Sequence, residues 1–304
     1  MRLALPVAVP AVFVALIVLA LMVAACSPLP VINRLVPTGT YSAVRDIAYL
    51  PEPGVSPRQR LDIYLPAPQP AARLPVIVFF YGGNWTSGAR ADYLFAGEAF
   101  ASQGFVAVIA DYRLYPEVRF PEFLNDSAQA FAWVQKNIAR YGGDPQRLFV
   151  AGHSAGAYNA AMLAFDPTYL KAAGSDAAAV KGFIGLAGPY DFLPLSSVTL
   201  REIFGFPDTS PATQPIHFVS GVPGVRLPPA LLLTAPDDTV VRARNSTHLA
   251  ARLRAAGGMV REISYPELDH ARLVGALAAP LRKQFGPVLG DIARFVRDIS
   301  AASG

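Results

Sequence analysis

A serine stands between two glycines in the stretch Gly152-His153-Ser154-Ala155-Gly156, with an apolar run over 148–151 before it and helix-forming residues over 158–163 after it. A G-x-S-x-G motif between a strand and a helix is typical of a sharp turn that lifts the serine hydroxyl out of a sheet. The glycines are needed because a Cβ at either position would collide with neighbouring backbone. The spacing therefore predicts that Ser154 is a nucleophile.

A serine hydroxyl is a weak nucleophile at neutral pH, so it needs a histidine base and an acid that orients this base. The chain has four histidines. We expect His153 to pack or bond locally beside the serine, His217 to lie in a proline-rich stretch, and His248 to lie on the surface of a helix. His270 follows a strand-like segment over 260–265, on the same carboxyl edge of the sheet as the serine. We predict that His270 is the base.

The acid is sought between the serine and the histidine, because the order Ser, Asp, His is expected of this arrangement. Asp237 and Asp238 are adjacent and follow an apolar run over 230–233. We favour Asp238, two residues before Val240, and leave Asp237 as a loop or helix cap. Asp191 is an outside candidate that is better explained as a turn residue.

A developing oxyanion needs preorganised donors, and backbone N–H groups supply them without rearrangement. The N–H of Ala155, directly after the nucleophile, is one candidate. The others are expected in the turn Tyr81-Gly82-Gly83-Asn84-Trp85, which follows the apolar run over 76–80. Consecutive glycines let the backbone approach a substrate closely. We predict the N–H groups of Gly83 and Asn84 as the remaining donors.

The elements that must position these residues alternate between short apolar runs and longer helical patterns. Runs that are apolar without alternation are typical of strands buried on both faces, and they cover 76–80, 105–110, 148–151, 183–186 and 231–233. Helical patterns cover 89–102, 122–140, 155–165, 244–256 and 287–301. A hairpin is expected around 41–50 and 59–65. The pattern predicts an α/β fold with a mostly parallel sheet covered by helices on both faces.

Residues 192–228 interrupt this alternation with six prolines and scattered aromatic residues. Long irregular insertions in compact domains are usually lids or binding loops. We expect this insertion to lie over the active site, where its aromatic residues, with Trp85 and Tyr158, are candidates for an apolar pocket. The whole of 41–304 is predicted to be one domain.

The N-terminal residues 1–26 are predicted to direct export. They are almost wholly apolar after Met1-Arg2 and end at Cys26, the only cysteine. The two alanines before Cys26 resemble the lipobox of bacterial lipoproteins, although Val23 stands where leucine is commoner, so Cys26 is a lipidation candidate. An uncleaved membrane anchor and ordinary secretion remain open, and each places the body in or beyond the bacterial cell envelope. Residues 27–40 are expected to form a proline-rich tether.

Composition limits the partners. The net charge of +4 is small for 304 residues and the basic residues are scattered, which argues against nucleic-acid binding. We expect membrane association through the N-terminal segment and a small-molecule or lipid-like ester as substrate. Oligomeric state is left open.

Several motifs together resemble the α/β-hydrolase superfamily from about residue 41 to 301. They are Phe80 to Gly88, the sequence Asp111-Tyr112-Arg113-Leu114-Tyr115-Pro116, and Tyr141-Gly142-Gly143-Asp144-Pro145. Within that superfamily they look like the carboxylesterases related to hormone-sensitive lipase and to the feruloyl-esterase-like and isoprenylcysteine-methylesterase-like groups. The resemblance implies a sheet of about eight strands and hydrolysis of carboxylic esters without a metal or a cofactor. It also implies an oxyanion loop written His-Gly-Gly-Gly-Trp, in which Tyr81 here replaces the histidine and Asn84 the third glycine.

These residues predict a serine hydrolase that cleaves carboxylic esters through an acyl-enzyme. Two rivals remain. An amide or formamide hydrolase could use the same three side chains, because a fold does not choose the leaving group. A catalytically silent binding protein on the envelope could keep the fold and use the insertion for partners.

Overall fold

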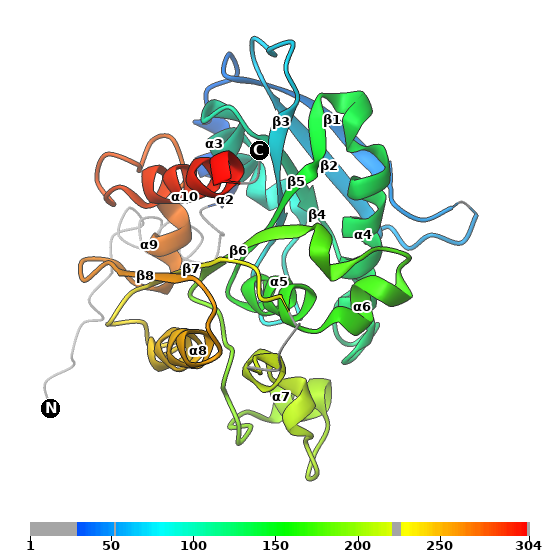
Figure 1. Cartoon of the computed structure of the whole chain (residues 1–304), viewed down its shortest axis with the longest axis vertical. Coiled ribbons are helices and arrows are strands. Elements are labelled where there is room, and N and C mark those ends of the chain that lie inside the picture. The colour runs from blue at the N-terminus through cyan, green and yellow to red at the C-terminus, as the bar shows by residue number, and fades with distance from the viewer. Residues whose placement is uncertain (1–28, 52, 221–225, 303–304) are drawn as a thin grey trace, which may run out of the picture.

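The computed structural model describes residues 29–51, 53–220 and 226–302. In these residues eight strands form one twisted sheet, in the order β1-β2-β4-β3-β5-β6-β7-β8 (Figure 1). The strands are β1 (Tyr41–Ala48), β2 (Arg60–Pro66), β3 (Leu74–Phe80), β4 (Val106–Ala110), β5 (Gly143–His153), β6 (Val180–Leu186), β7 (Ala230–Thr234) and β8 (Val260–Ser264).

The pairing follows the sequence pattern. β1 pairs with β2, and β2 with β4, in antiparallel fashion, whereas every pair from β4 through β8 is parallel. The apolar runs are parallel strands, and β4 is buried at each of its residues because helices cover both faces. The predicted α/β fold with a mostly parallel sheet of about eight strands is confirmed.

Helices cover the sheet on both sides (Figure 1). α3 and α10 pack against each other and against the sheet, while α4, α5 and α6 form a second group. The helices are α2 (Leu29–Arg34), α3 (Leu94–Ser102), α4 (Glu122–Asn137), α5 (Ala155–Phe165), α6 (Pro167–Ala172), α7 (Val198–Phe204), α8 (Arg244–Ala255), α9 (His270–Gly275) and α10 (Val288–Ala302). Short 3₁₀ turns are η1 (Arg90–Tyr93), η2 (Ile138–Tyr141), η3 (Ala177–Ala179), η4 (Pro211–Thr213) and η5 (Pro215–Phe218).

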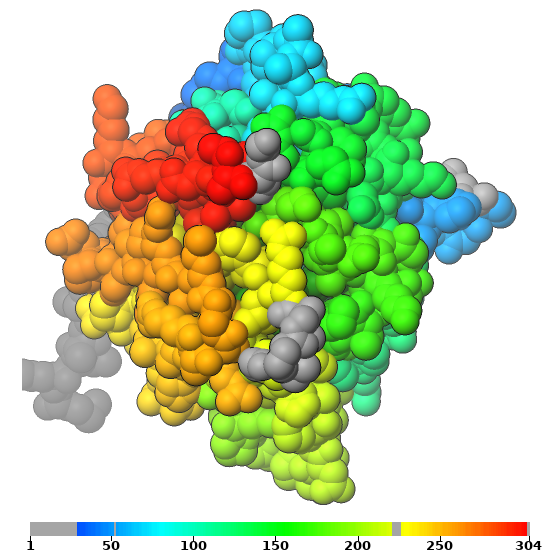
Figure 2. Space-filling view, in the orientation of Figure 1, coloured from blue at the N-terminus to red at the C-terminus, as the bar shows by residue number. Residues whose placement is uncertain are grey.

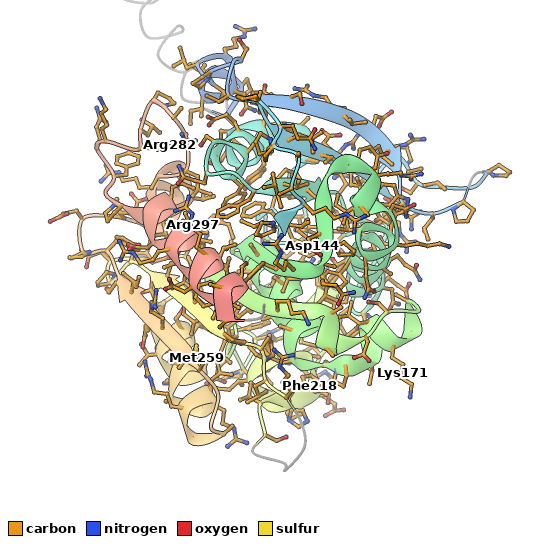
Figure 3. All side chains as sticks on the ribbon, turned by 45° about the horizontal axis from the view of Figure 1, so that its top comes forward. Asp144, Lys171, Phe218, Met259, Arg282 and Arg297 are labelled. Carbon is orange, nitrogen blue, oxygen red and sulfur yellow. The ribbon has the colours of Figure 1, made fainter. Side chains whose placement is uncertain are left out.

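Two arginines labelled in Figure 3 attach the C-terminal part of the chain to α3 and its following turn. Arg282 pairs with Glu98, a fully buried carboxylate of α3 that also accepts from the Thr40 hydroxyl at 3.0 Å. The guanidinium of Arg297 lies 5.5 Å from the centre of the Phe105 ring. These contacts join segments from both ends of the described chain to the central layer.

Part of the expected tether is ordered secondary structure. Residues 29–34 form α2, and the Asn33 side-chain amide donates to the carbonyls of Ala91 and Asp92 while its oxygen accepts from the N–H of Phe95. The structure differs from the expected tether here because the Asn33 side chain bonds to η1 and to the first turn of α3, contacts that composition does not reveal. Residues 1–28, with Cys26, lie outside the described residues.

The insertion is less irregular than its prolines indicate. Residues 198–204 form α7, which begins at Ser197, whose side chain accepts from the N–H of Leu200 at 3.0 Å. Residues of this insertion, drawn yellow-green, project from the body of the molecule (Figure 2). Among the described residues, no helix has the length and apolar character needed to cross a bilayer.

Candidate active site

The serine lies on a sharp turn between β5 and α5. Ser154 has φ 54° and ψ −124°, a combination that side chains rarely adopt. A Cβ on Gly152 would lie 2.3 Å from the backbone of Gly156, and a Cβ on Gly156 would lie 2.0 Å from the carbonyl oxygen of Phe80. The two glycines are therefore required by close backbone packing, as the motif predicts.

His270 and Asp238 come together at the same edge of the sheet. The Nδ1 atom of His270 lies 2.6 Å from Oδ2 of Asp238, and the side chain of Asp238 is almost fully buried. The other carboxylate oxygen accepts the N–H groups of Val240 and Val241, each at 2.8 Å. Asp237 is exposed and makes no such contact. The structure thus pairs the histidine with the favoured aspartate.

The surroundings of Asp238 favour its ionised form. Burial raises its pKa, but the hydrogen bonds from His270, Val241 and Val240 outweigh burial and hold the pKa below its usual value. The resulting contribution to folding stability is present above the usual carboxyl range and is lost as pH falls through the lowered pKa. Asp238 is accordingly a carboxylate at neutral pH, which suits it to orient His270.

Ser154 and His270 open into one cavity of about 950 Å³. No hydrogen bond joins their side chains in the described part of the chain. The hydrogen bond between a nucleophile and its base often tightens when substrate binds. Other residues that line the cavity include Gly83, Asn84, Trp85, Asp92, Ala155, Phe192, Ser196, Leu200, Arg242, Arg244 and Asn245.

The predicted oxyanion donors face this cavity. Gly83 has φ 136° and Asn84 has φ 54°, so both adopt the left-handed backbone that glycine and asparagine tolerate best. The Gly83 carbonyl accepts the N–H groups of Thr86 and Ser87, each at 3.0 Å. The N–H groups of Gly83, Asn84 and Ala155 donate to no acceptor among the described residues, which leaves them available to a ligand.

Tyr81 supports the loop in a way that the sequence did not indicate. Its ring stacks between those of Tyr93 and Tyr112, with centroids 5.6 Å and 4.9 Å away. The Tyr112 hydroxyl donates to the Tyr81 carbonyl at 2.7 Å. Burial and the nearby Asp111 carboxylate raise the pKa of Tyr81, so its hydroxyl stays neutral. Tyr81 thus braces the loop through ring stacking and its main chain.

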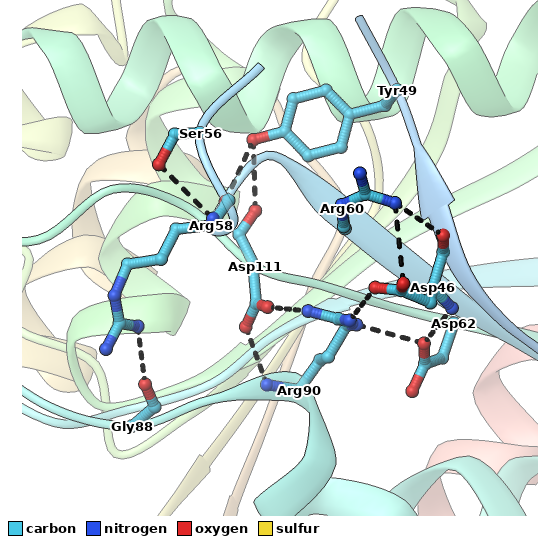
Figure 4. Close-up of polar contacts among 9 residues, drawn as sticks. All are labelled: Asp46, Tyr49, Ser56, Arg58, Arg60, Asp62, Gly88, Arg90 and Asp111. Carbon is cyan, nitrogen blue, oxygen red and sulfur yellow. Dashed lines mark hydrogen bonds and ion pairs between the residues drawn. The ribbon is translucent and has the colours of Figure 1, made fainter. Parts of the chain in front are cut away.

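A group of charged residues holds the far end of the same loop (Figure 4). The Arg90 guanidinium pairs with Asp111, with Asp62 at 2.9 Å and with Asp46 at 2.5 Å. Asp111 also accepts the backbone N–H of Arg90 at 2.6 Å, and Arg58 donates to the Gly88 carbonyl at 2.8 Å. Burial raises the pKa of Asp111 despite its hydrogen bonds and ion pair with Arg90. The three carboxylates come from β1, β2 and the segment directly after β4, and together with Arg58 and Arg90 they fix where the loop ends.

His153 connects the nucleophile turn with the base. Its Nε2 lies 3.0 Å from the backbone carbonyl oxygen of His270, and the two rings are 4.7 Å apart. Burial, and then the neighbouring His270, lower the pKa of His153 to about 3. The ring is therefore neutral at pH 7, and its Nε2–H donates to His270. Sequence reasoning foresaw a local contact for His153 but missed that the contact is with the base.

The remaining candidates lie apart from this group. His217 is exposed on η5 within the insertion. His248 lies on α8 and contacts the Asp191 carboxylate at 2.7 Å, with both side chains substantially exposed. No group of three or more His, Cys, Asp or Glu side chains could hold a metal ion within the parts of the chain that the structure describes.

Residues of the insertion line the cavity. Phe192 and Leu200 line it together with Trp85, whose indole N–H donates to Asn159 at 3.0 Å. Tyr158 does not line the cavity. It is fully buried behind Trp85, with its hydroxyl donating to the Thr213 carbonyl at 2.7 Å. Tyr158 therefore supports the pocket wall instead of contacting a ligand.

Comparison with known proteins agrees with this geometry. Residues 61–253 match the BD-FAE family. The chain belongs to the BD-FAE family of α/β hydrolases. The resemblance of the sequence to the α/β-hydrolase superfamily and its isoprenylcysteine-methylesterase-like group is therefore confirmed.

Two relatives and one solved structure illustrate the similarity. The chain is 29% identical over 265 residues to isoprenylcysteine alpha-carbonyl methylesterase ICME of Arabidopsis thaliana, covering 82% of this chain and 60% of that protein. It is 31% identical over 237 residues to esterase LipC of Mycobacterium tuberculosis, covering 72% and 57%. Esterase B from Lactobacillus rhamnosis, inhibited by a tributyrin phosphonate, shares the fold with a TM-score of 0.77 at 20% identity over 97% of both chains.

Proposed function

We propose that this BD-FAE protein is a serine hydrolase that cleaves carboxylic esters through an acyl-enzyme. The observation that carries the proposal is the 2.6 Å contact between His270 Nδ1 and the buried Asp238 carboxylate, at a cavity that the Ser154 turn also lines. The esterase names of the similar proteins support the same reaction class.

In the first half of the reaction, the Ser154 Oγ attacks the ester carbonyl carbon while His270 Nε2 takes the serine proton. Asp238 accepts from Nδ1–H and stabilises the imidazolium. The N–H groups of Gly83, Asn84 and Ala155 donate to the oxygen that becomes negative. When the carbon–oxygen bond to the leaving group breaks, His270 gives its proton to the departing alcohol, and the acyl group remains on Ser154.

In the second half, His270 takes a proton from water, and the hydroxide oxygen attacks the acyl carbon of Ser154. The same N–H groups hold the second oxyanion. Its collapse releases the carboxylic acid, and the proton on His270 returns to the Ser154 oxygen. The cycle consumes one water and one ester and yields one alcohol and one acid.

Turnover of 4-nitrophenyl butyrate by the full-length chain in nonionic detergent tests this proposal. We expect Ser154→Ala to lower kcat/KM by about 10⁴-fold or more, because residual activity then comes only from binding and the oxyanion donors. Ser196→Ala is the matched control, since Ser196 lines the same cavity, and it should stay within about tenfold of the unaltered protein. Turnover of 4-nitrobutyranilide without turnover of the ester would instead establish an amide hydrolase.

We further propose that residues 1–26 anchor the protein in the cell envelope and that Cys26 becomes the lipidated N-terminus. The apolar run and the single cysteine after two alanines support this proposal. Mass measurement of the mature N-terminus tests it. A diacylated Cys26 is the expected result, whereas an intact Met1 would favour an uncleaved membrane anchor.

A further inference from the structure

Two arginines of the active-site cavity have no side-chain partner among the described residues. Arg242 and Arg244 both line the cavity and both are exposed. Neither side chain makes an ion pair or a hydrogen bond with another described residue. Arg254, later on the same helix, lies 3.7 Å from the Glu262 carboxylate. The cavity is thus lined by two guanidinium groups that form no ion pair with a described residue.

The turn that carries these arginines is fixed to the proposed catalytic residues. Asp238 accepts the N–H groups of Val240 and Val241, immediately before Arg242. On the other side, the buried Asn245 amide donates to the Arg242 carbonyl at 3.2 Å. The Asn245 oxygen in turn accepts the N–H groups of Tyr190 and Asp191, each at 2.9 Å. The backbone at Arg242 is therefore held at a defined position relative to His270.

Helix electrostatics disfavours arginine at this place. Arg244 is the first residue of α8, whose first turn has no acidic residue and whose N-cap Ala243 offers no side-chain hydrogen bond. The N-terminus of a helix carries a partial positive charge, so cations there lower helix stability. Residues that oppose a local preference, such as the helix-dipole preference here, with no stabilising contact in the structure are expected mainly at functional sites. A bound anion would supply the missing compensation.

Negative charge in the cavity lies elsewhere. Among the described residues that line the cavity, the acidic one is Asp92. It belongs to η1, on the wall beside α2. It forms no ion pair with either arginine. The wall formed by 240–245 is therefore positive, and the planar guanidinium fork is well suited to a carboxylate or another oxyanion.

We propose that the cavity takes esters that carry an anionic group, a carboxylate above all, and that Arg242 and Arg244 bind this group. This inference rests on the proposed ester hydrolysis, for which it names the substrate class. The arginines act on the binding of substrate and transition state, and they take no part in the bond changes at Ser154.

Paired esters of equal length test the proposal with the full-length chain in nonionic detergent. On the acyl side, the 4-nitrophenyl monoester of glutaric acid is compared with 4-nitrophenyl pentanoate. On the alcohol side, 4-acetoxybenzoate is compared with 4-acetoxybenzamide. The quantity measured is the ratio of kcat/KM for the anionic ester to kcat/KM for its neutral match, which cancels general effects of a substitution on the catalytic residues.

We expect the ratio to fall at least tenfold in the double variant Arg242→Gln/Arg244→Gln. The fall should occur for the ester pair, acyl-side or alcohol-side, whose anionic group lies at this wall. Arg254→Gln removes the same charge from the same helix away from the cavity and should keep the ratio. For the unaltered protein, the ratio should also decrease when the salt concentration is raised from 0.01 M to 1 M, because the electrostatic screening length shrinks from about 30 Å to about 3 Å.

An unchanged ratio in both arms of the double variant, with the neutral esters still cleaved, overturns the inference and leaves the proposed ester hydrolysis standing. An equal fall in Arg254→Gln also overturns it, because net charge rather than the cavity wall would then be responsible. If none of the four esters is cleaved, the proposed function itself fails, and the inference fails with it.

Discussion

Asp238 follows the end of β7 and is held by contacts within its own turn, whereas the loop over 81–88 depends on side chains from distant strands. Asp238 bonds to two N–H groups within three residues of itself. The loop is fixed by Arg90, which joins carboxylates from β1, β2 and the segment after β4. The comparison teaches that one active site can combine a locally held catalytic aspartate with an oxyanion loop held by tertiary contacts.

The largest effect is expected from breaking the local arrangement. Asp238→Asn keeps the size of the side chain but replaces a carboxylate, which accepts from Nδ1–H, with an amide whose NH₂ group can donate to Nδ1. The substitution therefore favours the wrong tautomer of His270. We expect kcat at neutral pH to fall by about 10⁴-fold. Asp237→Asn is the matched control because it makes the same change one residue away on an exposed side chain. Similar losses in both variants would contradict the assignment of Asp238.

A smaller effect is expected from displacing the loop directly. A Cβ on Gly83 would lie 2.1 Å from the Ser87 carbonyl oxygen, at a φ of 136°. Gly83→Ala should therefore move a donor and lower kcat by about 10²- to 10³-fold. Gly104→Ala, at φ 86° with open space around its Cβ position, carries similar backbone strain away from the site. If Gly104→Ala lowers kcat as much as Gly83→Ala does, backbone strain and not the position of the loop is responsible.

Loosening the distant support of the loop should cost less. Arg90→Lys keeps the charge but loses the fork that bridges three carboxylates. We expect kcat to fall about tenfold with KM little changed, because the oxyanion donors act mainly on the transition state. Arg282→Lys alters a comparable pair with buried Glu98 and serves as the control. A change in KM alone would contradict this account of Arg90.

The last expected effect is on folding stability and concerns His153, the histidine that lies between the two regions. Below pH 6.5 the unfolded chain binds a proton at His153, which the folded chain does not bind until pH approaches 3. The free energy of unfolding should therefore fall on acidification across this window, by at most about 5 kcal/mol from this residue. His153→Gln should flatten the dependence in denaturant unfolding at pH 7 to 4. A variant with the full slope would show that His153 is not the group responsible.

The same comparison explains what the sequence could predict. The Ser154 turn, the choice of Asp238 over Asp237, and the strands that present them follow from local patterns of glycine, acid and apolar residues. The contacts by which Arg90 and Tyr112 support the loop over 81–88 could not be predicted, since they join residues far apart in the chain. The contact of His153 could not be predicted either, because it depends on where His270 lies after folding. The helices α2 and α7 were missed because proline-rich segments give little helical periodicity, although Asn33 and Ser197 stabilise them.

Covalent labelling with a fluorophosphonate, located by peptide mass mapping, tests the central claim most directly. Such a reagent reacts with an activated serine and mimics the tetrahedral species that the oxyanion donors bind. The account predicts one adduct, on Ser154, that is absent in Ser154→Ala and forms far more slowly in Asp238→Asn. Equal labelling of the unaltered protein and Ser154→Ala, or an adduct on another residue alone, would contradict it.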